Sequence, residues 1–293
     1  MQIMKENFNK ILDKKCLSSE VKWMKIFHPF IAKKAQPGQF IILRPLDESE
    51  RIPLTIAGTN IEEETIEIIF QEVGTTTKQL GSLNIGDYVH NIAGPLGKPV
   101  HIENYGRVLL VTGGVGAAFI FWMAKEFKNK GNSVWAVMGA RTASLLILEE
   151  EMRQICDKLF IATDDGSKGT KGFVTKVLED ALQSGERANI CLCAGPVLMM
   201  KNVAAITKKY NIKTIASLNP IMIDGTGMCG GCRVTVGGKI MFACVDGPDF
   251  DAHLVDFDEL LKRTSFYKKQ EQCSLEIYMK NASGDKFTST TKS

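Results

Sequence analysis

The stretch "RVLLVTGGVGAAF", Arg107–Phe119, predicts the fold of the middle of this chain. It reads as a buried strand, a glycine turn and the start of a buried helix. Such glycines let a backbone approach a pyrophosphate, and the helix N-terminus offers N–H donors. Phe119 stands where the dinucleotide fingerprint has Gly or Ala, and no acidic residue follows about twenty residues later. Alone, the stretch therefore leaves a nucleotide loop and a structural turn equally open.

The alternation of strand and helix continues after this stretch. "SVWAVMGA", "LFIATDD" and "ANICLCAG" are apolar runs of strand length, and "KTIASL" may add a last strand. Helices are expected near Ala117–Lys128, Ser144–Cys156, Gly172–Gln183 and Val197–Tyr210. This pattern predicts a doubly wound α/β domain with a parallel sheet over residues 103–218. "TDDGS" at Thr163–Ser167 and "CAGPVLMM" at Cys193–Met200 follow strands, where open sheets bind ligands, and this favours a nucleotide site.

The first part of the chain, residues 1–102, predicts a small antiparallel β-barrel. "VKWMKIF", "QFIILRPL", "IPLTIAG", "TIEIIFQEV" and "DYVHNIAGPLG" are short apolar runs separated by turn residues. "TTTKQLGSL" is the one helical stretch among them. Arg51, Pro53 and Thr55 lie close together in "RIPLTIAG" and suit a phosphate site, but that stretch alone favours an ordinary strand end.

The segment "DGTGMCGGCRVTVGGKIMFACVDGPDF", Asp224–Phe250, predicts a metal centre. Cys229 and Cys232 form a C-x2-C pair, Cys244 follows, and counting four residues back from Cys229 reaches Asp224. Plant-type ferredoxins hold a [2Fe–2S] cluster with C-x4-C-x2-C and a distant cysteine, so the spacing is intact with a carboxylate first. Structural zinc is the alternative, although a zinc ribbon would need a second close pair. Because the segment 219–262 is small and rich in glycine, we expect it to depend on its metal for folding.

The remaining residues of interest are assigned structural roles. Residues 263–293 form a C-terminal extension, "VDFDELLKR" a short helix before it, and 282–293 a frayed tail. Cys273 is left open. The other four cysteines are expected to be buried apolar residues, and two isolated histidines to be structural: Cys16, Cys156, Cys191, Cys193, His28 and His253.

Composition narrows the class of protein. A length of 293 residues suits two or three domains, and a net charge of +3 is too small to predict nucleic-acid binding. Val108–Ala124, the longest run without charge, is shorter than the roughly 20 residues of a membrane-spanning helix. No signal peptide is recognised at the N-terminus, so the eight cysteines predict thiols and metal ligands in a cytoplasmic protein.

Eight short motifs occur in an order that identifies a family resemblance. They are "PGQF", "RIPLTI", "GPLG", "GGVG", "GAR", "TDDGS", "AGPVLMM" and "DGTGMCGGCRVTVGGK". Over roughly residues 10–262 the chain resembles the ferredoxin–NADP reductase superfamily. Within it, the chain looks most like the small FAD/NAD-binding subunits of NADH-dependent reduced ferredoxin:NADP oxidoreductases, also called sulfide dehydrogenase beta subunits. The electron-transfer subunits of dihydroorotate dehydrogenase are related, and they have Cys where this chain has Asp224.

The resemblance implies three cofactor sites and no catalytic acid or base. FAD would bind the barrel at Arg51, Pro53, Leu54, Thr55, Gly74, Thr75 and Thr76. NAD(H) would bind the α/β domain at Gly114, Gly116, Asp165, Gly195 and Pro196. A [2Fe–2S] cluster would bind Asp224, Cys229, Cys232 and Cys244. Many members also have a cysteine directly before the Gly-Pro motif, where this chain has Ala194 and places Cys193 one residue earlier.

The implied function is electron transfer between NAD(H), FAD and the cluster within an electron-bifurcating complex. The implied partner is a larger flavoprotein with FAD and [4Fe–4S] clusters that binds NADP(H), with ferredoxin reached through the complex, and no nucleic acid or membrane. Two alternatives stay open: an electron-transfer subunit of an NAD-dependent dihydroorotate dehydrogenase, and a zinc-stabilised nucleotide-binding regulator. Arg141 could meet a 2′-phosphate, so the choice of NAD(H) over NADP(H) rests on the resemblance.

Overall fold

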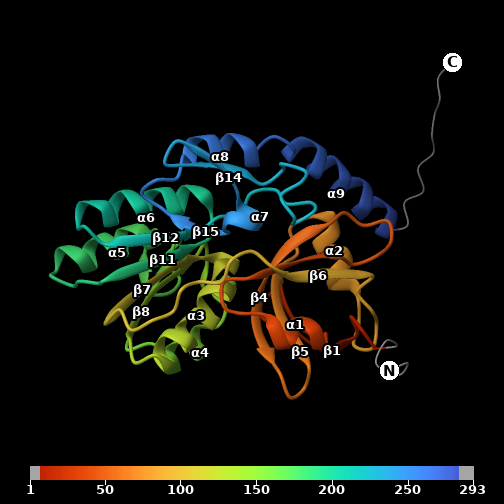
Figure 1. Ribbon diagram of the computed structural model, residues 1–293, viewed down its shortest axis with the longest axis horizontal. Helices are drawn as coiled ribbons and strands as arrows, with labels where there is room; N and C mark the ends of the chain where they lie inside the picture. Colours follow the sequence, from red (N-terminus) through yellow and green to blue (C-terminus); the bar gives the residue numbers. More distant parts are fainter. Residues whose placement is uncertain (1–6, 284–293) are drawn as a thin grey trace.

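Six antiparallel strands form the first sheet of the computed structural model, which describes residues 7–283 (Figure 1). The sheet order is β1-β2-β5-β4-β3-β6. An isolated antiparallel bridge between Lys10 and Tyr88 brings the two ends of the sheet together, as the barrel prediction requires. The strands are β1 (Ile11–Cys16), β2 (Val21–Phe27), β3 (Phe40–Arg44), β4 (Ile52–Asn60), β5 (Thr65–Gln71) and β6 (Asn91–Leu96).

The barrel encloses its own apolar core, with two helices at its ends. The core side chains alternate along each strand, as Met24 and Ile26 do on β2, and Trp122 joins them from the next domain. The predicted helix is α2 (Thr75–Ser82). Strand β1 and helix α1 (Pro29–Lys34) were not predicted, because β1 buries little besides its first residue and α1 is only six residues long.

Seven strands form the second sheet, in the order β10-β9-β8-β7-β11-β12-β15. All pairs are parallel except β15, which runs antiparallel to β12 at the edge. Helices α3 and α4 pack together on one side, and α5 and α6 on the other (Figure 1), so the doubly wound prediction is confirmed. The elements are β7 (Arg107–Gly113), β8 (Ser133–Ala140), β9 (Lys158–Thr163), β10 (Thr170–Lys171), β11 (Ile190–Ala194), β12 (Lys213–Ser217), β15 (Asp249–Asp251), α3 (Ala117–Asn129), α4 (Glu149–Ile155), α5 (Val174–Gln183) and α6 (Val197–Lys209), with 3-10 turns η1 (Gly114–Gly116) and η2 (Ala143–Leu145).

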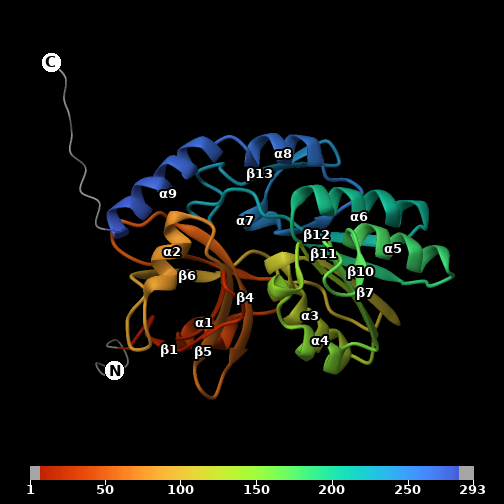
Figure 2. The same ribbon diagram turned by 180° about the vertical axis from the view of Figure 1, so that it is seen from behind.

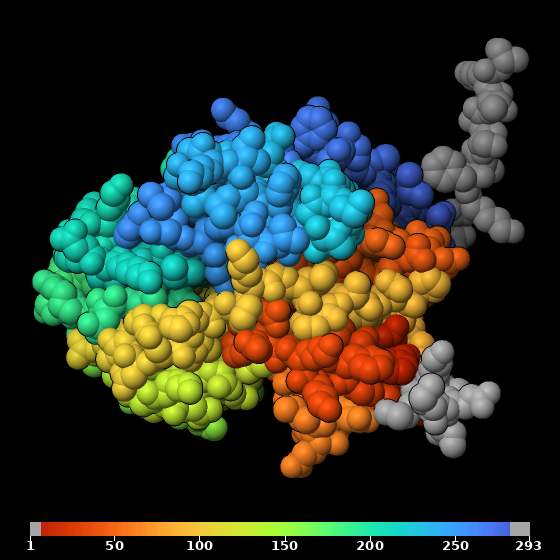
Figure 3. Space-filling view, in the orientation of Figure 1, coloured from red at the N-terminus to blue at the C-terminus, as the bar shows by residue number. Residues whose placement is uncertain are grey.

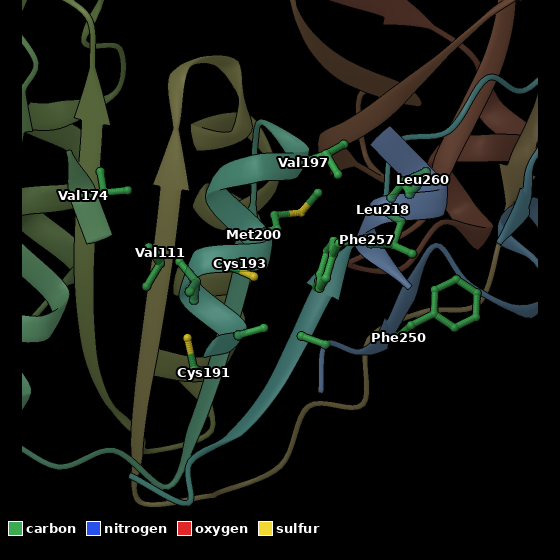
Figure 4. Close-up of a cluster of buried hydrophobic side chains, with 14 of the residues drawn as sticks. Val111, Val174, Cys191, Cys193, Val197, Met200, Leu218, Phe250, Phe257 and Leu260 are labelled. Carbon is green, nitrogen blue, oxygen red and sulfur yellow. The ribbon is translucent and has the colours of Figure 1, made fainter. Parts of the chain in front are cut away.

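The cysteine segment, residues 219–264, packs against the α/β domain through apolar side chains. It contains β13 (Arg233–Val236), β14 (Lys239–Phe242), α7 (Ala243–Asp246) and α8 (Phe257–Thr264). Figure 4 shows Phe257 and Leu260 of α8 near Val197 and Met200 of α6, and Phe250 of β15 belongs to the same buried cluster. Apolar packing therefore contributes to holding this segment, because β15 joins the large sheet and α8 buries its apolar face, and the dependence of its folding on a metal stays a prediction.

A last helix, α9 (Lys268–Ser283), extends the chain over the barrel. It lies alongside α2 (Figure 2), where Ser274 Oγ is 3.1 Å from Thr75 Oγ1. The space-filling view shows the blue segment that follows the α/β domain lying across both that domain and the barrel (Figure 3). This helix is largely exposed and has little apolar periodicity, so it was not predicted. Most of the predicted frayed tail, 284–293, lies outside the described residues.

No helix between residues 7 and 283 is both long and apolar enough to cross a membrane.

Candidate functional site

A cavity of about 410 Å³ opens at the carboxyl ends of the parallel strands. We call it the dinucleotide cavity. The loops after four strands contribute Gly114, Arg141, Asp164 and Pro196 to its lining. Parallel strands carry their loops to one edge of the sheet, and open α/β sheets bind ligands there. The prediction that the glycine loop, the "TDDGS" loop and the "AGPVLMM" loop converge is confirmed.

The barrel completes the dinucleotide cavity from the opposite side. Val21 and Gln71, on the paired strands β2 and β5, belong to its lining. Glu20 Oε2 accepts a hydrogen bond from Gln71 Nε2 at 2.8 Å. Arg141 Nη2 lies 4.0 Å from the same carboxylate oxygen. Sequence reasoning missed these barrel residues, because nothing in a strand's own pattern shows which domain it will face.

The predicted dinucleotide residues divide into two groups. Gly114 and Pro196 line the cavity, whereas Gly116, Asp165 and Gly195 flank it without belonging to its lining. Asp165 is exposed, and its Oδ1 accepts hydrogen bonds from the hydroxyl and the backbone N–H of Ser167, which lower the pKa of its carboxyl. The neighbouring Asp164 is the carboxylate that lines the cavity.

Glycine is needed at two positions of this loop for different physical reasons. Gly114 has φ of +59°, and a Cβ built there meets nothing within 4 Å, so open space lies in front of its backbone. At Gly116 a Cβ would lie 2.4 Å from the carbonyl oxygen of Ala194 and 2.7 Å from Thr112 Oγ1. Gly116 therefore lets helix α3 pack against β11, while Gly114 leaves room for a ligand.

Gly114→Asn is expected to weaken NADH binding about tenfold or more in a folded protein. Asn tolerates the left-handed conformation, but its side chain would occupy the space in front of the loop. Gly116→Ala is the matched variant, and it should instead lower the unfolding temperature by several degrees, because its Cβ meets backbone. Isothermal titration with NADH and thermal unfolding separate the two. Unchanged NADH affinity in folded Gly114→Asn would contradict the assignment.

The barrel residues predicted for FAD lie at strand β4 and at the N-terminus of helix α2. Arg51 directly precedes β4, and Pro53, Leu54 and Thr55 are half-buried on that strand. Gly74 is the N-cap of α2, followed by Thr75 and the buried Thr76 in its first turn. A Cβ at Gly74 would meet nothing within 4 Å, so this helix N-terminus faces open space, as a phosphate-binding end requires.

The cysteine loop, residues 221–232, holds three of the predicted ligands and places one of them, Cys232, beside the fourth, Cys244. Cys232 Sγ lies 3.2 Å from Cys244 Sγ, and both side chains are buried. Cys229 is exposed, and its Sγ accepts from the N–H of Gly231 at 3.4 Å. Among residues 7–283 no three His, Cys, Asp or Glu side chains surround a single-ion position. A two-iron cluster needs two protein ligands per iron, so an adjacent cysteine pair suits it better than one zinc ion.

Asp224 closes the cysteine loop on itself. Its Oδ1 accepts from the N–H of Thr226 at 2.8 Å, and its Oδ2 accepts from the N–H of Cys229 at 2.7 Å. These bonds, the one from Thr226 first, lower the pKa of its carboxyl. Each carboxylate oxygen has a second lone pair, so this capping leaves capacity for a metal ion. The donor set of three thiols and a carboxylate therefore fits an iron–sulfur cluster, with Asp224 positioned beside Cys229.

The other cysteines lie away from this loop. Cys191 and Cys193 are fully buried, as predicted, and burial raises the pKa of the Cys193 thiol well above its ordinary value. Cys193 is thus no nicotinamide-side thiol. Cys156 is half-buried, and its pKa is raised to about 12, mainly by burial. The prediction for Cys16 is wrong: it is exposed at the end of edge strand β1, 3.3 Å from Lys22 Nζ. Cys273 is exposed on α9.

The two histidines have the structural roles expected of them. His28 caps α1, because its Nδ1 accepts from the N–H of Ile31 at 3.2 Å, and burial lowers its pKa. His253 Nε2 lies 3.1 Å from Thr207 Oγ1.

Known families match the two C-terminal parts of this arrangement. The iron-sulfur cluster binding domain of dihydroorotate dehydrogenase B matches residues 219–256, and the oxidoreductase NAD-binding domain matches residues 110–205. The dihydroorotate dehydrogenase B (NAD(+)) electron transfer subunit homolog of Thermotoga maritima is 46% identical over 94% of this chain and 96% of its own length. A probable electron transfer subunit from Methanocaldococcus jannaschii is 35% identical over 73% of this chain and 79% of its own. The chain belongs to this family of electron-transfer subunits.

Solved structures agree with this membership. A chain of the NADH-dependent reduced ferredoxin-NADP oxidoreductase, a structure analysed for flavin-based electron bifurcation, is 45% identical with a TM-score of 0.88, covering 93% of this chain and 98% of that one. The ferredoxin reductase of carbazole 1,9a-dioxygenase, 16% identical with a TM-score of 0.61 over 69% of this chain and 64% of that one, shares the fold alone. The protein is thus an oxidoreductase subunit of ferredoxin reductase-like fold, with an NAD-binding and an iron–sulfur cluster-binding domain.

Proposed function

We propose that this protein is the small flavin subunit of an electron-bifurcating NADH-dependent ferredoxin–NADP oxidoreductase. In this role it passes electrons between NAD(H), FAD and a [2Fe–2S] cluster. One observation carries the proposal: a chain of such an oxidoreductase is 45% identical to this chain, and the match covers 98% of that chain's length. The segments 1–102, 103–218 and 219–262 would then serve FAD, NAD(H) and the cluster, with 263–293 as an extension.

The dinucleotide cavity supports NAD(H) as the substrate nucleotide. Gly114 gives the pyrophosphate room to approach the backbone, with Pro196 also lining the cavity and Gly116, Asp165 and Gly195 in the loops around it. Phe173 and Leu198 add apolar side chains to the lining of the cavity, against which a nicotinamide ring could pack. Asp164 suits a ribose 2′-hydroxyl and repels a 2′-phosphate.

The contact between the cysteine loop and the barrel supports a flavin beside the cluster. A Cβ at Gly225 would lie 2.6 Å from Leu96 Cδ1 and 2.9 Å from Ile42 Cδ1, so the loop rests directly on β3 and β6. The residues proposed for the flavin lie on the neighbouring β4, which carries Pro53, Leu54 and Thr55, and directly before it, at Arg51. Those proposed for its pyrophosphate, Gly74, Thr75 and Thr76, lie at the start of α2. When bound, FAD supplies the conversion of a hydride into single electrons, which the cluster carries onward.

The chain has too few cysteines for further clusters, so bifurcation requires a partner. With Asp224, Cys229, Cys232 and Cys244 assigned to one [2Fe–2S] cluster, the other five cysteines are too few and too dispersed for a second: two are buried in β11, one is half-buried and two are exposed. We propose a larger flavoprotein that carries FAD and [4Fe–4S] clusters, binds NADP(H) and reaches ferredoxin. The proposed compartment is the cytoplasm.

A second candidate function is electron transfer for an NAD-dependent dihydroorotate dehydrogenase. The match of residues 219–256 to the cluster-binding domain of that enzyme favours it. The same match weighs against the zinc-stabilised regulator. Affinity purification of the native complex separates the two enzymes: an NADP(H)-dependent flavoprotein supports the first, and a dihydroorotate-oxidising subunit supports the second.

The purified protein is expected to release FAD on denaturation and to oxidise NADH with an artificial acceptor, with kcat/KM at least about tenfold higher than for NADPH. The carboxylate of Asp164 in the cavity disfavours the 2′-phosphate, and Arg141, the one cation that the described residues contribute to the same lining, lies 4.0 Å from the carboxylate of Glu20. Steady-state kinetics with both nucleotides give the ratio, and Asp164→Asn should narrow it. A preference for NADPH would overturn the nucleotide assignment, and the absence of flavin would overturn the barrel assignment.

A further inference from the structure

Arg263, in the last turn of α8, reaches the cysteine loop from outside the matched cluster-binding segment. Its Nη2 donates a hydrogen bond to the carbonyl oxygen of Gly231 at 3.1 Å, across 32 residues of sequence. Gly231 lies between Cys229 and Cys232, and its own N–H donates to Cys229 Sγ at 3.4 Å. Helix α8 is fixed by packing on α6 and β13, so the guanidinium is held against the loop by the protein core.

The side chain of Arg263 is half-buried, and its guanidinium forms no ion pair with a carboxylate among residues 7–283. Its Nε is buried without a hydrogen-bond partner, and Gly231 is the single partner that the side chain has among residues 7–283. Arginine stays protonated in proteins, and a half-buried cation without an ion-pair partner is less well stabilised than one in water. A thiolate-ligated iron–sulfur cluster is an anion, and the ligands proposed for it flank Gly231.

We propose that Arg263 is a positioning residue that holds a positive charge against the cysteine loop and raises the reduction potential of the cluster. This rests on the proposed [2Fe–2S] cluster. One-electron reduction adds negative charge to the cluster, and a fixed cation nearby stabilises the reduced form more than the oxidised form. Net charge and hydrogen bonding around the cluster are known determinants of such potentials.

The test is a redox titration of the full-length, cluster-loaded protein, followed by electron paramagnetic resonance. Arg263→Gln should lower the equilibrium constant for cluster reduction about tenfold, which is ~59 mV for one electron. Arg263→Lys keeps the charge and should stay close to the wild type. The matched control is Lys262→Gln, which removes an exposed charge from the same helical turn and should leave the potential unchanged. An unchanged potential in Arg263→Gln, or an equal shift in Arg263→Lys, would overturn the proposal.

Iron retention and stability of the metal-free protein give a second, independent measurement. Loaded Arg263→Gln should release iron to a chelator several-fold faster than the wild type. Without metal it should unfold at the same temperature or higher, because the half-buried charge without an ion-pair partner is gone. A metal-free variant that unfolds at a clearly lower temperature would make Arg263 merely structural. A wild type that binds no cluster would instead refute the proposed function, so the two failures are distinguishable.

Discussion

Asp224→Ala is expected to reduce bound iron about tenfold or more. The substitution removes a proposed ligand and also the two hydrogen bonds that hold the N–H groups of Thr226 and Cys229. Loss of a group that only orients a ligand typically costs 10–100-fold in metal affinity, and loss of a ligand costs more. The damage should be confined to the cysteine loop, because β15 and α8 are held by apolar packing. Iron analysis and far-ultraviolet circular dichroism measure the two effects.

Two further variants separate ligation by Asp224 from capping. Asp224→Asn keeps an oxygen that can accept from the loop but loses the charge, and Asp224→Cys provides a thiolate but no cap. A carboxylate is a harder ligand than a thiolate, so Asp224→Cys should keep the cluster with an altered electron paramagnetic resonance spectrum and potential. Asp224→Asn should lose most of the iron. A full cluster with an unaltered spectrum in Asp224→Asn would remove Asp224 from the ligand set.

Asp249→Asn is expected to stabilise the protein by about 4 kcal/mol at pH 8. Both carboxylate oxygens of Asp249 are buried without a hydrogen-bond partner. The residue lies where β15 meets the barrel, and a Cβ at Gly38 would be 3.0 Å from Asp249 Oδ2. Burial raises the pKa of this carboxyl from 3.8 to about 7. At about 1.36 kcal/mol per pKa unit, that difference corresponds to about 4 kcal/mol.

The sign of this effect follows from proton binding. The folded state holds the proton of Asp249 more tightly than the unfolded state, so the contribution to stability is complete below pH 3.8 and is lost as the pH rises to about 7. Asp249→Asn removes this pH dependence of the free energy of unfolding. Its gain in stability over the wild type should therefore be near zero at pH 4 and largest above pH 7. Urea unfolding at several pH values measures it. The control is Asp251→Asn on the same strand, whose carboxylate accepts from the N–H of His253 at 2.9 Å and should show no gain at high pH. An advantage of Asp249→Asn that does not grow with pH would contradict the explanation.

The local pattern of the sequence determined most of the secondary structure. Continuous apolar runs such as Arg107–Gly113 were correctly predicted to be buried strands. A parallel strand is covered on both faces, so nearly all its side chains must be apolar. Helices that place apolar residues on one face, such as α5, were predicted for the same reason. Elements without such a face, β1 and α9, were missed. The spacing of Asp224, Cys229 and Cys232 is likewise a local property, readable before any fold is known.

Only the tertiary structure decided which residues meet. Gly114 and Gly116 look alike in sequence, but the first faces open space and the second faces the carbonyl oxygen of Ala194 on a strand some eighty residues later. Val21 reaches the dinucleotide cavity and Arg263 reaches the cysteine loop only after separate domains pack together. The physical reason is that periodicity records whether a side chain is buried, whereas the identity of its neighbours depends on how distant segments close against each other.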